Sequence, residues 1–433
     1  MKILPFALSA ALTLPLLVGC ASTKSDTVTT TGATTTTGET TTTGATTATG
    51  ASTTPPPSTK DHDAILKANE YAAIGHELCL KIIDDYYVEK THTLRSEPKS
   101  NTPAFVWPYA TFLETLSDAL RLYPEDEKIR STYVDALSKG LDRYRVKVTT
   151  LSTPAGKFSN ITYYNSTRGA SGDYYYDDNA WICLQFLTAY ELLGDKAYLD
   201  LAIELLEFFK TGIDDELGGG IYWDKTFGSK NTCANGPVAI AFLTAYKYTN
   251  VDEYLEIGRS LYDWLNEKLY DGGLYSDSIN KKGEINAWKA AYNQATPITA
   301  ACLLYEITGE SKYLTRANKT QLSATSLCFN IKGRGDSYSA SMNGNPIYKS
   351  WCIGWLMRGY YAHAKASGKQ NRAFDAMEYV LKKNESTKTD AGYFDPYFSS
   401  GDWKGESTTE VLQPCGVAST YLVCARYDME LRN

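Results

Sequence analysis

Three tight turns in the middle of the chain share one residue pattern and recur at intervals of about 60 residues, which marks a repeated structural unit. Each turn has Gly or Asn, then an acidic residue, then a Tyr-Leu pair, and the turns begin at Gly194, Asn250 and Gly309. Gly and Asn are common where a helix ends, and acidic residues are common where the next one begins. The repeat therefore predicts helical hairpins, each made of two helices joined by a short turn.

Apolar residues recur with helical spacing through almost all of the chain after residue 61. This spacing predicts an all-α fold of twelve helices in six hairpins, the count expected of an (α/α)6 toroid or barrel over residues 61–433. An open solenoid of stacked helix pairs is the alternative. The expected helices are at residues 64–87, 105–122, 125–147, 178–193, 196–212, 234–248, 251–269, 295–307, 310–327, 347–367, 371–384 and 410–428.

The connections between successive hairpins are long and rich in Gly, Tyr, Trp, Asn and Asp. Short turns at one end and long polar and aromatic loops at the other indicate a single functional face, because loops held by a rigid scaffold often carry binding and catalytic residues. This asymmetry favours a site-bearing barrel over a plain scaffold. The expected loops are residues 150–177, 213–233, 270–294, 328–346 and 385–409.

The N-terminal segment has the pattern of an export signal rather than of a folded element. Residues 1–19 begin with a single lysine and continue as a short apolar run, typical of a signal peptide. The sequence from Leu17 to Cys20 resembles the bacterial lipobox, which implies cleavage before Cys20 and lipid attachment to it; an ordinary signal peptide with a chance cysteine is the alternative. Residues 20–60 are rich in Thr, Gly and Pro, and this composition predicts a disordered linker. We therefore expect a bacterial lipoprotein anchored to the membrane and exposed to the periplasm or the cell surface.

Composition excludes several classes of function. A net charge of −7, a pI near 5.4 and the lack of Lys/Arg clusters argue against nucleic-acid binding. The four histidines have no metal-ligand spacing, so neither a metal nor another cofactor is expected, and the chain is expected to act as a monomer. Cysteines in apolar runs are expected to be small buried hydrophobes, with one or two disulfides left open; these are Cys183, Cys302, Cys352 and Cys424. The 33 tyrosines suit ligands that are half apolar and half polar, such as sugars.

Two adjacent carboxylates, Asp177 and Asp178, follow three consecutive tyrosines at the start of a predicted helix. A helix cap accounts for one aspartate at such a position, but not for two behind an aromatic cluster. Glycoside hydrolysis needs two carboxyl groups, one to protonate the leaving oxygen and one to attack or to activate water. If the first of the two residues is not yet helical, both can face one cavity. The pair is therefore our candidate catalytic centre.

The residues around this pair resemble glycoside hydrolase family 76, the endo-α-1,6-mannanases. The first block of the resemblance is Tyr176 to Trp181, followed by the segment 187–195. The second block comprises residues 219–223, 230–231 and 235–237, and the third comprises residues 273–277 and 292–294. Ala295 departs from the small Gly expected after the third block. The blocks cover residues 170–315 in the order and spacing of that family.

The resemblance implies an (α/α)6 barrel that cleaves α-1,6-mannosidic linkages in α-mannan or manno-oligosaccharides with retention of configuration. It implies that Asp177 is the nucleophile and Asp178 the general acid/base. Asp277 corresponds to a third carboxylate that binds sugar hydroxyls, and four further residues are candidate walls of the substrate site or else loop-packing residues: Trp223, Asn235, Tyr292 and Asn293. The helical aromatics Trp107, Trp351 and Trp355 are expected in the core.

Other functions compatible with the sequence are a transglycosylase, another (α/α)6 carbohydrate hydrolase, and a non-catalytic glycan-binding lipoprotein. A hydrolase of unsaturated uronides would need cationic residues near the acid pair, and Arg168 is the nearest in sequence. A binding protein would need aromatic side chains but no paired carboxylates. Transglycosylation uses the same nucleophile as hydrolysis, so the sequence leaves it open.

Overall fold

A computed structural model describes residues 66, 69–169, 172–344, 350–399 and 410–432. The predicted signal peptide, the Cys20 lipid attachment site and the linker at 20–60 lie outside the described residues. Within them, no helix combines the length and the apolar character needed to cross a membrane.

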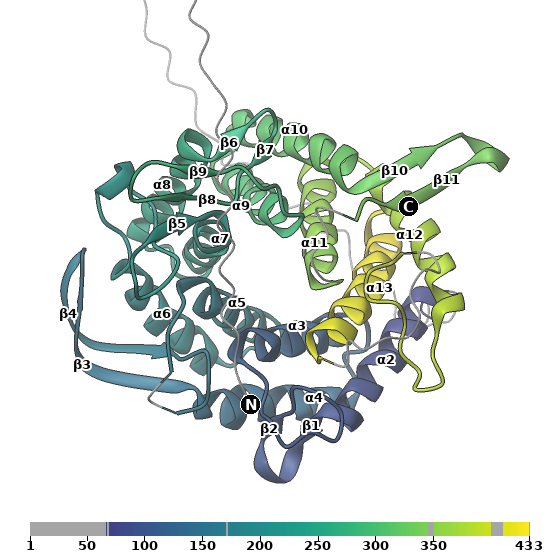
Figure 1. Cartoon of the computed structure of the whole chain (residues 1–433), viewed down its shortest axis with the longest axis horizontal. Coiled ribbons are helices and arrows are strands. Elements are labelled where there is room, and N and C mark those ends of the chain that lie inside the picture. The colour runs from purple at the N-terminus through teal and green to yellow at the C-terminus, as the bar shows by residue number, and fades with distance from the viewer. Residues whose placement is uncertain (1–65, 67–68, 170–171, 345–349, 400–409, 433) are drawn as a thin grey trace, which may run out of the picture. The chain divides into compact units, whose positions relative to one another are not determined.

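Twelve long α-helices in the described residues form two concentric layers (Figure 1). Each inner helix packs against the next, and the last packs against the first, so the inner layer is a closed ring. This closure confirms the predicted (α/α)6 toroid and excludes the open solenoid. The inner helices are α3 (Val106–Leu122), α5 (Tyr176–Leu193), α7 (Thr232–Thr249), α9 (Tyr292–Thr308), α11 (Ser350–Ser367) and α13 (Leu412–Leu431). The outer helices are α2 (Glu70–Tyr86), α4 (Glu127–Asp135), α6 (Lys196–Lys210), α8 (Asp252–Lys268), α10 (Ser311–Cys328) and α12 (Arg372–Asn384).

The first and last helices, α2 and α13, pack against each other and complete the sixth pair. The other pairs are consecutive in the chain, with each inner helix leading through a short connection into an outer helix. The N-termini of the inner helices and the long loops therefore meet at one end of the ring. This end is called the loop face below.

The repeated turns have the predicted conformation. Gly194, Asn250 and Gly309 end their helices in the left-handed region, with φ of 72°, 56° and 72°. The tyrosine of each turn is buried against the helix pair, as the Tyr-Leu pattern predicts; these are Tyr198, Tyr254 and Tyr313. The four cysteines predicted to be buried, Cys183, Cys302, Cys352 and Cys424, are buried as well.

The long loops contain short antiparallel strands, which the helical pattern did not predict. The helix expected at 125–147 is shorter: α4 continues as brief helical turns to Arg143, and a hairpin of β3 (Arg145–Thr153) and β4 (Gly156–Tyr164) follows. Strands β5 (Ser229–Asn231), β8 (Ser278–Asn280) and β9 (Ile285–Asn286) form one sheet in the order β5-β8-β9. This sheet joins two loops of the loop face. The remaining pairs are β1 (Tyr87–Val88) with β2 (Thr93–Leu94), β6 (Tyr270–Asp271) with β7 (Leu274–Tyr275), and β10 (Phe329–Lys332) with β11 (Ser339–Met342).

Helices α9 and α11 approach each other closely where the sequence departs from the family pattern. Ala295 of α9 is fully buried, and it faces Gly359 of α11. A Cβ atom at position 359 would lie 2.9 Å from the Ala295 carbonyl oxygen. The glycine on α11 therefore leaves the space that a side chain at position 295 needs.

Candidate active site

The predicted site residues lie on the loop face, at the N-terminal ends of three neighbouring inner helices. Asp177 and Asp178 belong to the first turn of α5, Asn235 to the first turn of α7, and Tyr292 and Asn293 to the start of α9. Two loop residues complete the set: Trp223 precedes β5, and Asp277 precedes β8.

The two aspartates are helical, whereas we expected them at a junction where the first was not yet helical. Helix α5 begins at Tyr176, because the Tyr176 N–H donates to the Trp223 carbonyl at 2.8 Å. The N-cap residue is Tyr175, and no side chain caps it. Capping therefore explains neither aspartate. Asp177 and Asp178 are each half-buried as residues, but surrounding atoms bury their carboxyl groups.

The Asp177 carboxylate accepts several hydrogen bonds. The indole Nε1 of Trp223 donates to Oδ2 at 2.9 Å, and the backbone N–H of Asp178 donates to Oδ1 at 2.9 Å. The thiol of Cys233, in the first turn of α7, donates to the same carboxylate. Donors to a carboxylate stabilise its ionised form. Asp177 is thus the member of the pair that is equipped to carry a negative charge.

Asp178 has different surroundings. Among the described residues, no donor binds its carboxyl group. Burial, together with the adjacent charge of Asp177, raises the pKa of Asp178 well above its usual range. Burial also raises the pKa of Asp177, but only to about 6, because the hydrogen bonds from Trp223 and Cys233 oppose it. The structure therefore separates the two aspartates into a readily ionised and a readily protonated group.

Asp277 is held at the edge of the site by three donors. Asn293 and Asn286 donate to its two carboxylate oxygens at 3.1 Å each, and the Ser278 hydroxyl donates at 3.1 Å. Burial raises the pKa of Asp277, and these three hydrogen bonds oppose the rise. Burial also raises the pKa of the Tyr292 phenol, with Asp277 and Asp177 both close enough to add to the shift. Asp177, Asp277 and Tyr292 therefore lie close enough for the charges of the two aspartates to act on the Tyr292 phenol.

Asn235 and Asn293 lie beneath the surface, and their side chains form hydrogen bonds with other protein groups. Both are fully buried. Asn235 Oδ1 accepts from the Ile221 N–H at 2.8 Å, and its Nδ2 donates to the Ile221 carbonyl at 2.9 Å. The side chain thereby fixes the loop that leads to Trp223. Of the two readings of Asn235, loop packing is the one that these contacts support.

The same amide clamp recurs in neighbouring hairpins, although we did not predict it. Asn179 of α5 pairs in this way with the backbone of Tyr164, and Gln294 of α9 pairs with the backbone of Tyr275. Each amide nitrogen also donates to the carbonyl four residues earlier in the chain. The sequence signal is an amide near the start of each of these three inner helices, spaced like the repeated turns.

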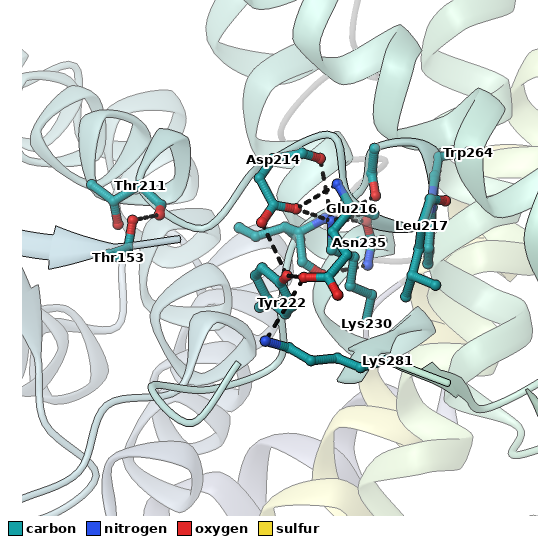
Figure 2. A network of polar contacts seen from close by, with 12 residues as sticks. Thr153, Thr211, Asp214, Glu216, Leu217, Tyr222, Lys230, Asn235, Trp264 and Lys281 are labelled. Carbon is teal, nitrogen blue, oxygen red and sulfur yellow. Dashed lines mark hydrogen bonds and ion pairs between the residues drawn. The ribbon is translucent and has the colours of Figure 1, made fainter. Parts of the chain in front are cut away.

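Lys230 anchors the loop that carries Trp223 (Figure 2). Its side chain is completely buried, and its ammonium group lies 2.6 Å from Asp214 Oδ1. It also donates to the carbonyls of Glu216 and Gly219 at 2.8 Å each and lies 4.6 Å from the centre of the Tyr222 ring. Burial lowers the pKa of Lys230, against the attraction of Asp214. These contacts hold residues 214–222 in place immediately before Trp223.

Two of the three helical tryptophans that we expected in the core lie there, whereas the third, Trp107, is half-buried. Trp351 and Trp355 are 2% and 6% exposed, and Trp107 packs against the same core. Trp351 lies 5.3 Å, between ring centres, from Tyr292. Trp351 and Trp355 therefore lie under the site and do not form its solvent-exposed wall.

Sequence reasoning missed two groups that touch the candidate carboxyls. Cys233 directly follows the first residue of α7, and Asn286 lies in β9, nine residues after Asp277. The sheet formed by β5, β8 and β9 places Cys233 and Asn286 next to the candidate carboxyls. The local sequence gives no indication of this sheet. Among the described residues, no three His, Cys, Asp or Glu side chains converge as a metal site requires.

Solved structures with the same fold were found across most of the chain. The mannosidase Bt3792 of Bacteroides thetaiotaomicron, of glycoside hydrolase family 76, is 23% identical with a TM-score of 0.71, covering 83% of this chain and 99% of that one. The GH76A α-1,6-mannanase of Salegentibacter sp. HEL1_6 is 25% identical with a TM-score of 0.63, covering 83% and 100%. An inactive variant of that mannanase, with two consecutive aspartates replaced by asparagine, was solved with α-1,6-mannotriose; it is 24% identical with a TM-score of 0.62, covering 82% and 99%. Among curated proteins no match was found.

A closed ring of helix pairs with two carboxyls at its loop face is the architecture of an (α/α)6 glycoside hydrolase. The family model described as "Glycosyl hydrolase family 76" matches residues 74–419. This chain therefore belongs to glycosyl hydrolase family 76, which confirms the family resemblance of its sequence blocks.

Proposed function

We propose that this protein is a retaining glycoside hydrolase that cleaves α-1,6-mannosidic linkages in mannan. The observation that carries the proposal is the unequal environment of two adjacent carboxyls. Asp177 accepts hydrogen bonds from Trp223 and the Asp178 N–H, whereas Asp178 has no protein donor among the described residues. A glycosidase needs one ionised and one protonated carboxyl at the same pH, and unequal environments supply them.

The roles follow from this inequality. Asp177 attacks the anomeric carbon and forms a glycosyl ester, while the Asp178 carboxyl gives its proton to the departing glycosidic oxygen. The Asp178 carboxylate then takes a proton from water, which attacks the ester and releases the sugar and Asp177. Asp277, held by Asn293 and Asn286, supplies a carboxylate for sugar hydroxyls. Each step needs only the side chains named here.

The choice of linkage rests on the relatives. Family 76 structures similar to this chain include an α-1,6-mannanase, and variants of it that lack two consecutive aspartates were solved with α-1,6-manno-oligosaccharides. The adjacency of Asp177 and Asp178 is the matching feature here. We also propose that the lipobox-like sequence at Cys20 anchors the enzyme to a bacterial membrane, facing the periplasm or the cell surface. Radiolabelled palmitate should label the wild-type protein in cells but not Cys20→Ala.

Incubation with linear α-1,6-mannan tests the proposal. We expect new reducing ends, shorter manno-oligosaccharides on chromatography and, by proton NMR, a first-formed product with the α configuration. β-1,4-mannan is the control polymer and should remain intact. No new reducing ends between pH 4 and pH 8 would contradict the proposed activity; that window brackets, by about two units each way, the pKa of about 6 at Asp177.

A further inference from the structure

Another buried carboxyl, Glu114 of α3, lies inside the ring and takes no part in the mechanism above. It is 2% exposed, and its carboxylate accepts from two indoles of α11. Trp351 Nε1 donates to Oε2 at 2.9 Å, and Trp355 Nε1 lies 3.1 Å from Oε1 and 3.2 Å from Oε2. Arg358, one turn further along α11, approaches Oε2 to 3.8 Å.

These contacts cross the interior of the ring. The neighbours of helix α11 in the ring are α9 and α13. Helix α3 lies beyond α13, so the hydrogen bonds from α11 to Glu114 join two helices that are not adjacent in the ring. The same indoles reach Trp181 of α5, on the opposite side of the ring, with ring-centre separations of 5.1 Å for Trp351 and 4.7 Å for Trp355. The three tryptophans therefore fill the centre of the ring, and Glu114 is the acceptor for two of them.

Two of the tryptophans in this cluster, Trp181 and Trp351, lie next to residues of the candidate active site. Trp181 lies four residues after Asp177 and therefore on the same face of α5, one turn below it. Trp351 packs against Tyr292 at 5.3 Å between ring centres, and Tyr292 directly precedes Asn293, the donor to Asp277. A rotation of Trp351 would therefore displace both Trp181, below Asp177, and Tyr292, next to the donor to Asp277, whereas a rotation of Trp355 would displace Trp181.

We propose that Glu114 is a positioning residue of the active site, which fixes the indoles of Trp351 and Trp355 and through them the floor under the two functional carboxylates. An indole has one N–H donor, and a buried donor must find an acceptor. The Glu114 carboxylate accepts hydrogen bonds from both indole N–H groups. It thereby fixes the orientation of the two rings, which pack against Trp181 and Tyr292. The proposal rests on the proposed glycosidase activity for its kinetic readout.

The charged surroundings of Glu114 offer a matched control. Asp118, one turn further along α3, forms an ion pair with the same Arg358, whose guanidinium lies 5.2 Å from the centre of the Trp355 ring, but among the described residues it accepts no hydrogen bond from a tryptophan. Asp118→Asn therefore removes a carboxylate from Arg358 and leaves the indoles bonded. Glu114→Gln keeps the size of the side chain and replaces one acceptor oxygen by an amide that faces an N–H donor.

The experiment compares Glu114→Gln, Asp118→Asn and the wild type by near-UV circular dichroism and by kinetics on α-1,6-mannan. For Glu114→Gln we expect a changed tryptophan spectrum and a kcat lower by about ten- to a hundredfold, the effect of a small misplacement of catalytic groups, with KM within about threefold. Asp118→Asn should match the wild type in both measurements. A wild-type spectrum or a wild-type kcat in Glu114→Gln overturns the proposal, as does an equal loss in Asp118→Asn.

Two further measurements keep the test decisive. If Glu114→Gln does not fold, Trp351→Phe removes one indole N–H and keeps an aromatic ring, and it should lower kcat in the same way; an unchanged kcat overturns the proposal. Where both variants fold, their double mutant should lose no more than the larger single effect, because they break one interaction. A wild type that is inactive on mannan contradicts the proposed function instead, and the spectrum of Glu114→Gln then still tests the anchoring of the indoles.

Discussion

The loop face holds two clusters of buried ionisable groups, one around Lys230 and one formed by Asp177 and Asp178, and their surroundings are opposite. Lys230 is completely buried and is met by Asp214 and by three backbone carbonyls (Figure 2). Asp177 and Asp178 are two like charges side by side, and no protein donor among the described residues reaches the second of them. The charge of Lys230 is paired within the protein, whereas the carboxyl of Asp178 has no partner in the described part of the protein and is free to interact with a substrate.

This difference separates a structural from a catalytic use of buried charge. A buried ion that is fully paired fixes the chain around it, and removing one partner leaves the rest uncompensated. A pair of like charges destabilises the fold and is retained where the reaction needs its unequal pKa values. The comparison predicts that substitutions in the first cluster lower stability and that substitutions in the second lower activity.

The largest effect is expected from the aspartate pair. Asp177→Asn should lower kcat by about 10⁴-fold or more, since it removes the nucleophile, and Asp178→Asn should lower it by about 10²–10⁴-fold, since it removes the proton donor. Both variants should unfold in urea at the wild-type midpoint or above it, because each removes one of two adjacent buried carboxyls that repel each other when both are ionised. If both aspartate variants were less stable and their folded fraction kept its activity, the aspartate pair would have a structural role like that of Lys230, and the comparison would be wrong.

The second effect belongs to Lys230. Lys230→Met removes the cation paired with the Asp214 carboxylate and the donor to the carbonyls of Glu216 and Gly219, and we expect a loss of about 3–5 kcal/mol in the free energy of unfolding. Lys281, exposed and 3.7 Å from Glu216, is the matched control, and Lys281→Met should cost less than about 1 kcal/mol. Urea denaturation measures both. Equal losses would show that burial of Lys230 does not matter.

Trp223 connects the two clusters, because the loop that Lys230 holds ends on the donor to Asp177. Trp223→Phe keeps an aromatic ring but removes a hydrogen bond to a charged group, and kcat/KM should fall by about ten- to a hundredfold, equivalent to about 1.5–3 kcal/mol. Trp264 is the control: its indole donates to the Leu217 carbonyl at 3.1 Å, away from the aspartates. Trp264→Phe should lower stability and leave kcat/KM unchanged. If the two variants behave alike, the Trp223 indole acts only through packing.

Local sequence predicted the repeated elements of the fold well. The turns at Gly194, Asn250 and Gly309 carry their own signal, since each needs a residue tolerant of the left-handed region at a fixed place. Helix starts were predicted less well, because they depend on distant partners. Helix α5 starts at Tyr176 through a hydrogen bond to Trp223, and α7 starts at Thr232, whose N–H donates to the Asp277 carbonyl. These partners lie 47 and 45 residues away in the chain.

The β3–β4 hairpin was wrongly assigned in part to a helix and in part to a loop. Its first strand is rich in Val and Thr, which favour strands, but we gave more weight to the helical pattern before it. In the candidate site, the adjacent carboxylates after three tyrosines indicated Asp177 and Asp178, and the family blocks supplied their separate roles and Asp277. Local sequence could not show that Asn235 binds the loop backbone or that Glu114 meets two indoles, because both facts depend on how the ring closes.

The pH dependence of activity gives the finest test of the unequal pair. Hydrolysis as proposed needs Asp177 ionised and Asp178 protonated. Because the pKa of Asp177 is raised to about 6, kcat/KM of the wild type should fall on the acid side below about pH 6, approaching tenfold per pH unit. Trp223→Phe removes a donor that lowers this pKa, so its acid limb should lie at higher pH than that of Trp264→Phe. An acid limb near pH 4 in the wild type would show that burial does not raise the pKa of Asp177.

The same raised pKa values fix the sign of the stability change. An aspartate in the unfolded chain has a pKa of about 3.9, so between about pH 4 and pH 6 the unfolded state loses protons that folded Asp177 still holds. Folded Asp177 keeps its proton in this window, so its contribution to the free energy of unfolding falls as pH rises; Asp178, with its higher pKa, extends this fall to higher pH. Carboxyls with lowered pKa values, such as Asp85 and Asp126, contribute with the opposite sign, so the share of the pair is the difference between wild type and variant. Urea titrations at pH 4.5 and pH 7 measure the fall, and it should be smaller in Asp178→Asn. Lys230→Met should keep the full fall at a lower overall stability, because it leaves both aspartates in place.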